Sequence, residues 1–239
     1  MPQESKYCHA RKETNCVTCI KKRFSLLDGL NKQELAILEE NRTHLLFSKG
    51  ETIYKEGARP MGLMCLSMGK AKIVKNGPRF KEQIIALKKP VDFIGFSELM
   101  TNEPFIASSI AIEESSVCII DRDDFFTVMK SNADFFIKVT RFLSAEIHHT
   151  ANRMVSLTQK NMQARLAEAL LYIEDIYGTK ADKKTLDVVI KRADMAALAN
   201  MTTANVIRTL SDFKNRGIID TVNKELQILK PEELARISG

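Results

Sequence analysis

The chain has 239 residues, enough for one large domain or two modest ones, and its 44% apolar and 28% charged residues are typical of a globular protein. No apolar run is long enough to span a bilayer, and the opening residues MPQESKYCHARKET lack the apolar core of a signal peptide. We therefore expect a cytoplasmic protein without a membrane partner. The net charge of +6 permits nucleic-acid binding, but residues 161–239 hold 12 Lys/Arg against 11 Asp/Glu, so bulk charge cannot establish it.

Residues 1–22 form a charged, aperiodic stretch, predicted to be a surface arm, that contains Cys8, Cys16 and Cys19. The chain has five cysteines in all, and an odd number in a reducing compartment argues against a disulfide framework. Metal ligation and reactive thiols are then the alternatives. Beyond the arm, Asn31 followed by Glu34 predicts the capped start of a short helix.

Between residues 44 and 121 the pattern changes to short alternating segments punctuated by glycine. The segments include LLFSKGETIYKEG, GLMCLSMGKAKIVKNG and SSIAIEESSVCIID. Evenly spaced short strands with turn signals predict a sandwich, barrel or jelly roll.

From residue 123 to about 158 the pattern is helical, and apolar or small residues recur at alternating spacings of four and three. This is the a/d pattern of a coiled coil, and it predicts a dimer seam. A single amphipathic helix packed on its own domain is the alternative. The seam residues are Phe136, Thr140, Leu143, Ile147, Thr150, Met154 and Leu157.

The most informative stretch is residues 192–217, which predicts two short helices joined by a turn at Asn200–Met201. Thr202 occupies the N-cap of the second helix, and Val206, Leu210 and Phe213 define its buried face. The opposite face is small and polar. Such a face suits a recognition helix in the DNA major groove, with residues 218–229 forming a hairpin wing. An αα-hairpin in an ordinary core is the alternative.

The predicted recognition helix covers about residues 202–216. Arg208 is at the centre of its polar face, where a guanidinium can bond guanine bidentately. We predict that Thr203, Asn205 and Arg208 reach base edges or adjacent phosphates, and that Arg192, Thr202 and Lys214 hold the DNA backbone. The four histidines are scattered and no nucleophile motif accompanies them, so no enzyme activity is expected.

Taken together, the chain resembles the CRP/FNR superfamily of bacterial transcription regulators over nearly its whole length. The segments that carry the resemblance are FSKGETIYKEG, VDFIGF, SSVCIID and ADMAALANMTTANVIRTLSDFKNRGII. The resemblance implies an α+β fold with an N-terminal β-roll of the jelly-roll, cyclic-nucleotide-binding type, a long dimerisation helix and a C-terminal winged helix-turn-helix. The boundaries we predict are 1–22 for the arm, 23–130 for the sensor, 131–160 for the dimer helix and 161–239 for the DNA-binding domain.

The resemblance also implies a homodimer that reads two half-sites on double-stranded DNA, and RNA polymerase as a partner. A redox, oxygen or small-molecule signal would act through the β-roll and the dimer helix. Cyclic-nucleotide-binding members carry an arginine in a phosphate cassette, but residues 95–118 contain no arginine. A cyclic phosphate would lack its bidentate partner, which argues against cAMP.

The cysteines are more similar to the oxygen-sensing FNR branch, whose members hold a [4Fe–4S] cluster. That likeness implies Cys8, Cys16, Cys19 and Cys118 as ligands, with Cys118 expected to end a strand at the pole of the β-roll that the arm crosses. Zinc held by Cys8, His9, Cys16 and Cys19, thiol redox sensing, and inert residues are the alternatives. Cys65 is interpreted as a small core residue.

Overall fold

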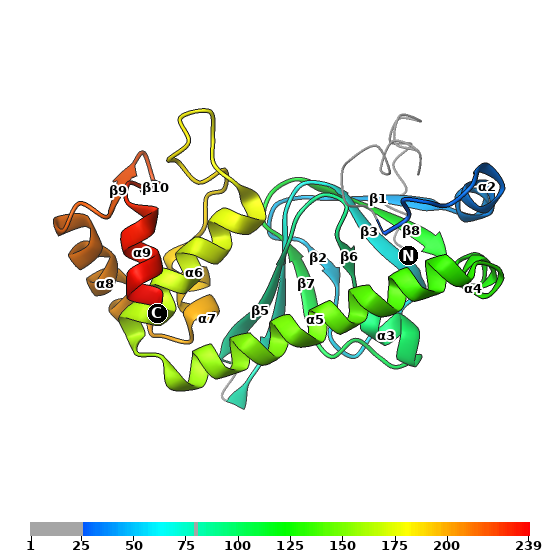
Figure 1. Ribbon diagram of the computed structural model, residues 1–239, viewed down its shortest axis with the longest axis horizontal. Helices are drawn as coiled ribbons and strands as arrows, with labels where there is room; N and C mark the ends of the chain where they lie inside the picture. The colour runs from blue at the N-terminus through cyan, green and yellow to red at the C-terminus, as the bar shows by residue number, and fades with distance from the viewer. Residues whose placement is uncertain (1–25, 79–80) are drawn as a thin grey trace, which may run out of the picture. The chain divides into compact units, whose positions relative to one another are not determined.

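The computed structural model describes residues 26–78 and 81–239, so the predicted arm lies outside the described residues. These residues divide into two compact units. The first comprises residues 26–75 and 88–148, and the second comprises residues 76–87 and 149–239. Figure 1 shows the order of the helices and strands along the chain.

Two four-stranded sheets form the predicted β-roll. The first has the strand order β1-β8-β3-β6 and the second β2-β7-β4-β5. Each pairing with an assigned register is antiparallel, as expected for strands connected by short glycine turns. The strands are β1 (Thr43–Phe47), β2 (Thr52–Tyr54), β3 (Gly62–Met68), β4 (Ala71–Asn76), β5 (Glu82–Lys88), β6 (Phe93–Ile94), β7 (Ser108–Ala111) and β8 (Ser115–Asp121).

The short helices of the first unit are fixed by their caps. In α2 (Lys32–Glu40), the Asn31 side chain accepts hydrogen bonds from the Gln33 and Glu34 amides, and the Glu34 carboxylate accepts one from the Asn31 amide. The predicted capping box is therefore confirmed. The Asp121 side chain caps α4 (Arg122–Ser131) by accepting hydrogen bonds from the Asp123 and Asp124 amides, and α3 (Phe96–Thr101) follows Gly95.

The stretch from residue 123 to about 158 is helical, as predicted, and it divides into two helices. Asn132 has an extended backbone and separates α4 from α5 (Ala133–Gln159). Its side-chain oxygen accepts the Phe135 amide, and its side-chain nitrogen donates to Glu34 at 2.8 Å. An asparagine that bonds nearby backbone competes with the helix, which explains the break.

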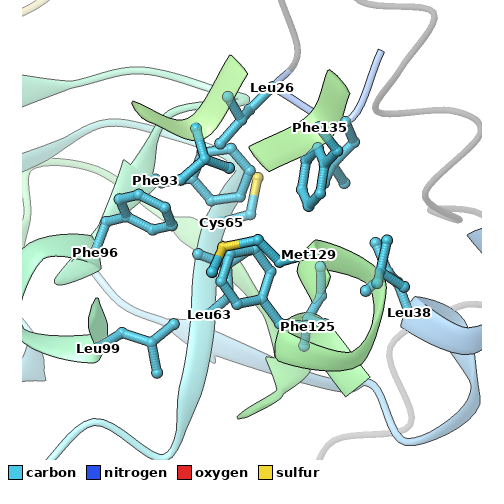
Figure 2. Packing of buried hydrophobic residues seen from close by; sticks show 14 of the residues in the cluster. Leu26, Leu38, Leu63, Cys65, Phe93, Phe96, Leu99, Phe125, Met129 and Phe135 are labelled. Carbon is cyan, nitrogen blue, oxygen red and sulfur yellow. The ribbon is translucent and has the colours of Figure 1, made fainter. Parts of the chain in front are cut away.

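The core of the first unit joins the β1-β8-β3-β6 sheet to α2, α3, α4 and the start of α5. Figure 2 shows Phe125 in its midst. Its ring contacts Phe96 and Phe135 edge-on at centroid distances of 5.9 and 6.0 Å. Leu26, the first described residue, packs in the same cluster, so the chain enters this core directly after the undescribed segment.

Helix α5 has apolar side chains on two faces. Phe135 and Val139 are buried in the core of the first unit. Further along, Ile147 is 67% and Met154 63% exposed. The first turns of α5 therefore fit the alternative of a helix packed on its own domain, and the dimer seam along the later turns stays a prediction.

The second unit contains the predicted winged helix-turn-helix. Helix α6 packs against α7 and α9, α7 packs against α8, and β9 pairs with β10 in an antiparallel hairpin. The elements are α6 (Met162–Tyr177), α7 (Arg192–Ala199), α8 (Thr203–Asn215), β9 (Ile219–Val222), β10 (Glu225–Ile228) and α9 (Pro231–Ser238). With the β-roll and the long helix, this confirms the predicted α+β fold.

The expectation that Cys118 ends a strand is wrong. It lies in the middle of β8, 4% exposed, opposite His44 of β1 on one side and Cys65 of β3 on the other. The run Ser115–Ile120 is buried residue by residue because β8 is a central strand covered on both faces. The interpretation of Cys65 as a core residue is confirmed by its burial in the same cluster.

Candidate DNA-binding site

The turn between α7 and α8 is set by two polar residues. Asn200 adopts a left-handed conformation with φ of 49°, which asparagine tolerates better than most residues. The Met201 amide then donates back to the Ala196 carbonyl at 2.9 Å and closes the turn. Thr202 caps α8, because its hydroxyl accepts the Asn205 amide at 3.2 Å.

The two faces of α8 divide as the sequence predicts. Val206, Leu210 and Phe213 are buried and pack the helix onto its domain. The outward residues Ala204, Arg208, Ser211 and Asn215 are exposed. A capped helix with one buried stripe and one small polar stripe can enter a major groove without a change of shape.

Arg208 is held in a defined orientation at the centre of this outer stripe. Its guanidinium donates to the Asn205 side-chain oxygen at 3.1 Å. The amide nitrogen of Asn205 in turn lies 3.2 Å from the Met162 sulfur at the start of α6. These two contacts order the Arg208 side chain before DNA binds. They therefore lower the entropy cost of contacting a base edge.

The other predicted contact residues differ in how freely they are presented. Thr202 and Thr203 are exposed at the start of α8, where helix N-termini attract phosphate. Lys214 is bound to Asp220 of the wing at 2.8 Å, and this hydrogen bond lowers the pKa of the Asp220 carboxyl. Arg192 is half-buried beside the Met195 sulfur, and loss of water around it lowers its pKa.

The wing carries residues that the sequence analysis did not single out. Asn223 and Lys224 both have positive φ, of 50° and 70°, between β9 and β10. Two left-handed residues in a two-residue hairpin make a type I′ turn. The usual sequence signal is Asn-Gly, and Lys224 in the glycine position hid it. On α8, the exposed Ile207 was also missed; such an apolar side chain can contact a thymine methyl group.

In the β-roll, residues 95–107 correspond to the phosphate cassette that the family resemblance suggested. Tyr54 stacks on Phe105 with ring centroids 3.9 Å apart. Burial raises the pKa of the Tyr54 hydroxyl, and the charge of Glu98 adds to that shift. The Glu98 carboxylate accepts the Ile106 amide at 3.3 Å. The loop is thus held by the chain's own side chains.

Of the predicted metal ligands, only Cys118 falls among the described residues. Over residues 26–78 and 81–239, no three His, Cys, Asp or Glu side chains converge to hold a metal ion. Cys8, Cys16 and Cys19, with His9, lie outside that range. None of the helices in the described part of the chain is long and apolar enough to cross a membrane.

Comparison with known proteins agrees with this architecture on both sides of α5. Residues 44–132 match the cyclic nucleotide-binding domain family, and residues 164–237 match the Crp-like helix-turn-helix domain family. The chain belongs to the CRP/FNR family of transcription regulators. It is therefore a DNA-binding regulator, and the expectation that it is not an enzyme agrees with its relatives, which are regulators.

Individual CRP/FNR relatives match over almost their full length. The chain is 26% identical to a CRP-like cAMP-activated global transcriptional regulator of Mycobacterium tuberculosis over 90% of this chain and 96% of that protein. It is 23% identical to the transcriptional activator FnrA of Stutzerimonas stutzeri over 99% and 97%. Among solved structures, FixK2 of Bradyrhizobium japonicum shares the fold with a TM-score of 0.75, at 21% identity over 83% of this chain and 98% of that one.

The orientation of Arg208 leads to a first prediction. Substitution Arg208→Ala should cost about 1–3 kcal/mol of operator binding and relax specificity at one base pair per half-site. Mobility shifts with the operator and with scrambled duplex at matched salt measure both effects. Arg236→Ala is the matched control, because Arg236 is 72% exposed on α9. Wild-type binding by Arg208→Ala would contradict the assignment of α8.

The Lys214–Asp220 ion pair leads to a second prediction. Asp220→Asn should release the ammonium group for phosphate contact, so DNA affinity should rise at low salt and the salt slope should steepen by up to about 1. Lys214→Ala should lower the affinity for both specific and non-specific duplex and make the salt slope shallower. Asp175→Asn removes the same charge from an exposed site on α6 and serves as the control. An unchanged slope in Asp220→Asn would show that Lys214 does not contact DNA.

Proposed function

We propose that the protein is a homodimer that binds two DNA half-sites, with one α8 in the major groove at each. The observation that carries this proposal is the outward stripe of α8, where Arg208 is exposed and oriented by Asn205. In a symmetric dimer, two such helices read half-sites about one helical turn apart. Operator recognition would then mirror the symmetry of the protein.

Within this proposal the six predicted residues have two kinds of role. Thr203, Asn205 and Arg208 reach base edges or the phosphates beside them. Thr202 contributes through the helix N-terminus that it caps, and Lys214 holds the backbone once it leaves Asp220. Arg192 is the weakest member, because its guanidinium is half-buried. Lys224 at the wing tip is added as a backbone contact.

The dimer is proposed to form along the later turns of α5. Ile147 and Met154 expose most of their apolar surface, and Leu143 and Leu157 are half-buried on either side. Covering such side chains contributes roughly 25 cal/mol for each Å² removed from water. Thr150 places no charge in the seam, so the dimer should form without any ligand. The predicted dimer helix, residues 131–160, contains α5 in full.

For the effector, we propose a signal other than cAMP, although one relative carries cAMP activation in its name. A cyclic phosphate needs a guanidinium, and residues 95–107 contain none. In addition, Tyr54 stacks on Phe105, and Glu98 is engaged with the Ile106 amide. The remaining domain boundaries, RNA polymerase as a partner and action in the cytoplasm are proposed from the family alone.

For the metal, we propose a site confined to Cys8, His9, Cys16 and Cys19, a Cys₃His set of the kind zinc prefers. A [4Fe–4S] cluster needs a fourth thiolate. Cys118, its implied donor, is buried in the middle of a central strand, and Leu63 and Ile120 belong to the same core cluster. That position does not fit a ligand at the rim of the β-roll.

Charge placed in the seam tests the proposed dimer. Ile147→Glu would oppose two carboxylates and should yield monomers that no longer bind the operator tightly. Sedimentation and mobility shifts on the same samples measure both outcomes. Ala145→Glu adds the same charge to an exposed position about half a turn away on α5 and should leave the dimer intact. A wild-type protein that is monomeric at micromolar concentration would refute the dimer.

Metal analysis tests the proposed cysteine site. Protein purified without oxygen should be colourless and hold zinc, and Cys118→Ala should hold it equally well. Elemental analysis and a visible absorption spectrum of both proteins measure this. Iron and acid-labile sulfide that are present in wild type and lost in Cys118→Ala would instead establish a four-cysteine cluster. A metal-free wild type would leave the cysteines without a ligand role and refute the proposal.

A further inference from the structure

Met162, the first residue of α6, contacts the recognition helix from a neighbouring element. Its sulfur lies 3.2 Å from the side-chain nitrogen of Asn205, and the residue is 47% exposed. The Asn161 side chain caps α6 by accepting the Ala164 amide at 3.0 Å, which fixes the backbone from which Met162 projects. A thioether beside the proposed DNA interface is therefore open to small solutes.

Two polar contacts connect Met162 to Arg208 through Asn205. The Oδ1 atom of Asn205 accepts from the Arg208 guanidinium at 3.1 Å, and its Nδ2 atom faces the Met162 sulfur. A guanidinium can only donate and a thioether can only accept, so one orientation of the Asn205 amide satisfies both neighbours. Met162 is therefore a positioning residue for two side chains that are proposed to contact DNA.

The thioether is the weakest hydrogen-bond partner in this set. Because methionine sulfur is a weak acceptor, the Nδ2 atom of Asn205 can leave it for an oxygen atom of DNA at little cost. Oxidation changes that balance, since a methionine sulfoxide carries a polar oxygen on a side chain that was apolar. The sulfoxide oxygen would hold the Asn205 amide more strongly. It would also bring negative partial charge to a surface that meets phosphates.

Exposure distinguishes Met162 from the other methionines of the winged helix-turn-helix. Residues 161–239 contain three methionines, and two of them, Met195 and Met201, are 1% and 5% exposed. An oxidant dissolved in water reaches an exposed sulfur directly, whereas a buried sulfur is reached only when the core opens. Met162 is therefore the sulfur of this domain that such an oxidant meets first.

We propose that Met162 is a site of reversible oxidation by a hydroperoxide and that its oxidation lowers operator binding. A lone pair of the Met162 sulfur attacks one peroxide oxygen, the O–O bond breaks, and an S–O bond forms. The sulfur is oxidised by two electrons and the peroxide is reduced. The proton of the attacked oxygen moves to the leaving oxygen, which departs as water or an alcohol. The sulfoxide then keeps the Asn205 amide from DNA and disturbs the orientation of Arg208.

This inference rests on the proposed function, because it assumes that Asn205 and Arg208 contact DNA. It adds an input that acts on the recognition helix directly, separate from the β-roll and from the cysteines of the arm. Methionine sulfoxide is returned to methionine by sulfoxide reductases, so the change is reversible. Exposure to peroxide would reduce occupancy of the operator until the thioether is restored.

Treatment of the full chain with hydrogen peroxide, followed by dithiothreitol, tests the site. Dithiothreitol reverses disulfides and sulfenic acids of the cysteines and leaves methionine sulfoxide in place. Mobility shifts should then show an operator affinity about two- to tenfold lower than before treatment, as expected for one altered hydrogen bond. Peptide mass spectrometry measures sulfoxide at Met162, and methionine sulfoxide reductase should restore binding.

Two substitutions to leucine locate the effect, and each is judged by the ratio of its affinities before and after peroxide. Met162→Leu removes the sulfur and should give a ratio close to one. Met154→Leu is the matched control, because Met154 of α5 is 63% exposed, and it should keep the loss seen in wild type. Met162→Gln places an amide oxygen near Asn205 and should bind the operator less tightly without any peroxide. Circular dichroism establishes that each variant is folded.

Three outcomes would overturn the proposal. Mass spectrometry could find no sulfoxide at Met162, wild type could bind equally well with Met162 oxidised, or Met162→Leu could lose binding as wild type does. If Met154→Leu alone abolishes the loss, oxidation acts on the proposed dimer seam instead and the proposal also falls. Wild-type operator binding by Arg208→Ala would refute the assignment of α8 itself, so the two failures are distinguishable.

Discussion

Helix α5 carries apolar side chains on two faces, and both faces need to be covered from water. Its first turns insert Phe135 and Val139 beneath the β-roll, next to Phe125. Its later turns leave Ile147 and Met154 exposed. The helix has 27 residues, and its first turns belong to the core of the first unit. Helix α5 thus contributes to the core of the first unit and also exposes apolar side chains. In the proposed dimer, this would connect ligand binding in the β-roll to the dimer contact.

In the second unit, Arg153 of α5 links several segments through polar contacts. Its guanidinium bonds carbonyl groups from two segments far apart in sequence, at Ile84 in β5 and Leu198 in α7, and it covers the ring of Tyr172 in α6. Lys81 adds a bond of 2.9 Å to the side chain of Asn200. These contacts explain why residues 76–87 group with the C-terminal part of the chain. Directional bonds to backbone carbonyls specify one position, whereas apolar contacts would tolerate several.

The case for DNA binding rests on where the basic side chains lie and not on the net charge. The C-terminal part of the chain is almost neutral, and two of its basic side chains are partly occupied, Lys214 by Asp220 and Arg192 by burial. The outer face of α8 then presents an oriented Arg208 among small polar residues. In the proposed complex, base contacts by this face would therefore contribute to the affinity together with phosphate contacts.

The sequence by itself determined the elements whose signals are local. Periodicity located α5 and α8, Asn31 and Thr202 marked caps, and glycine spacing revealed the β-roll, because these signals act between residues three or four apart or within one turn. The same local patterns placed Arg208 on the outer face of the recognition helix. They did not reveal the break at Asn132 between α4 and α5, which a side-chain bond to Glu34 supports, or the type I′ turn at Asn223–Lys224 inside the predicted wing.

Only the tertiary structure decided what depends on residues distant in sequence. Cys118 reads like a strand-end ligand, but sheet order makes β8 a central strand and buries it opposite Cys65. The pairing of Lys214 with Asp220, the span of Arg153 from β5 to α7 and the buried Nε of Arg165 have no trace in spacing or composition. Burial and hydrogen bonding depend on contacts between segments that are distant in sequence. Local sequence patterns do not show which of these segments come together.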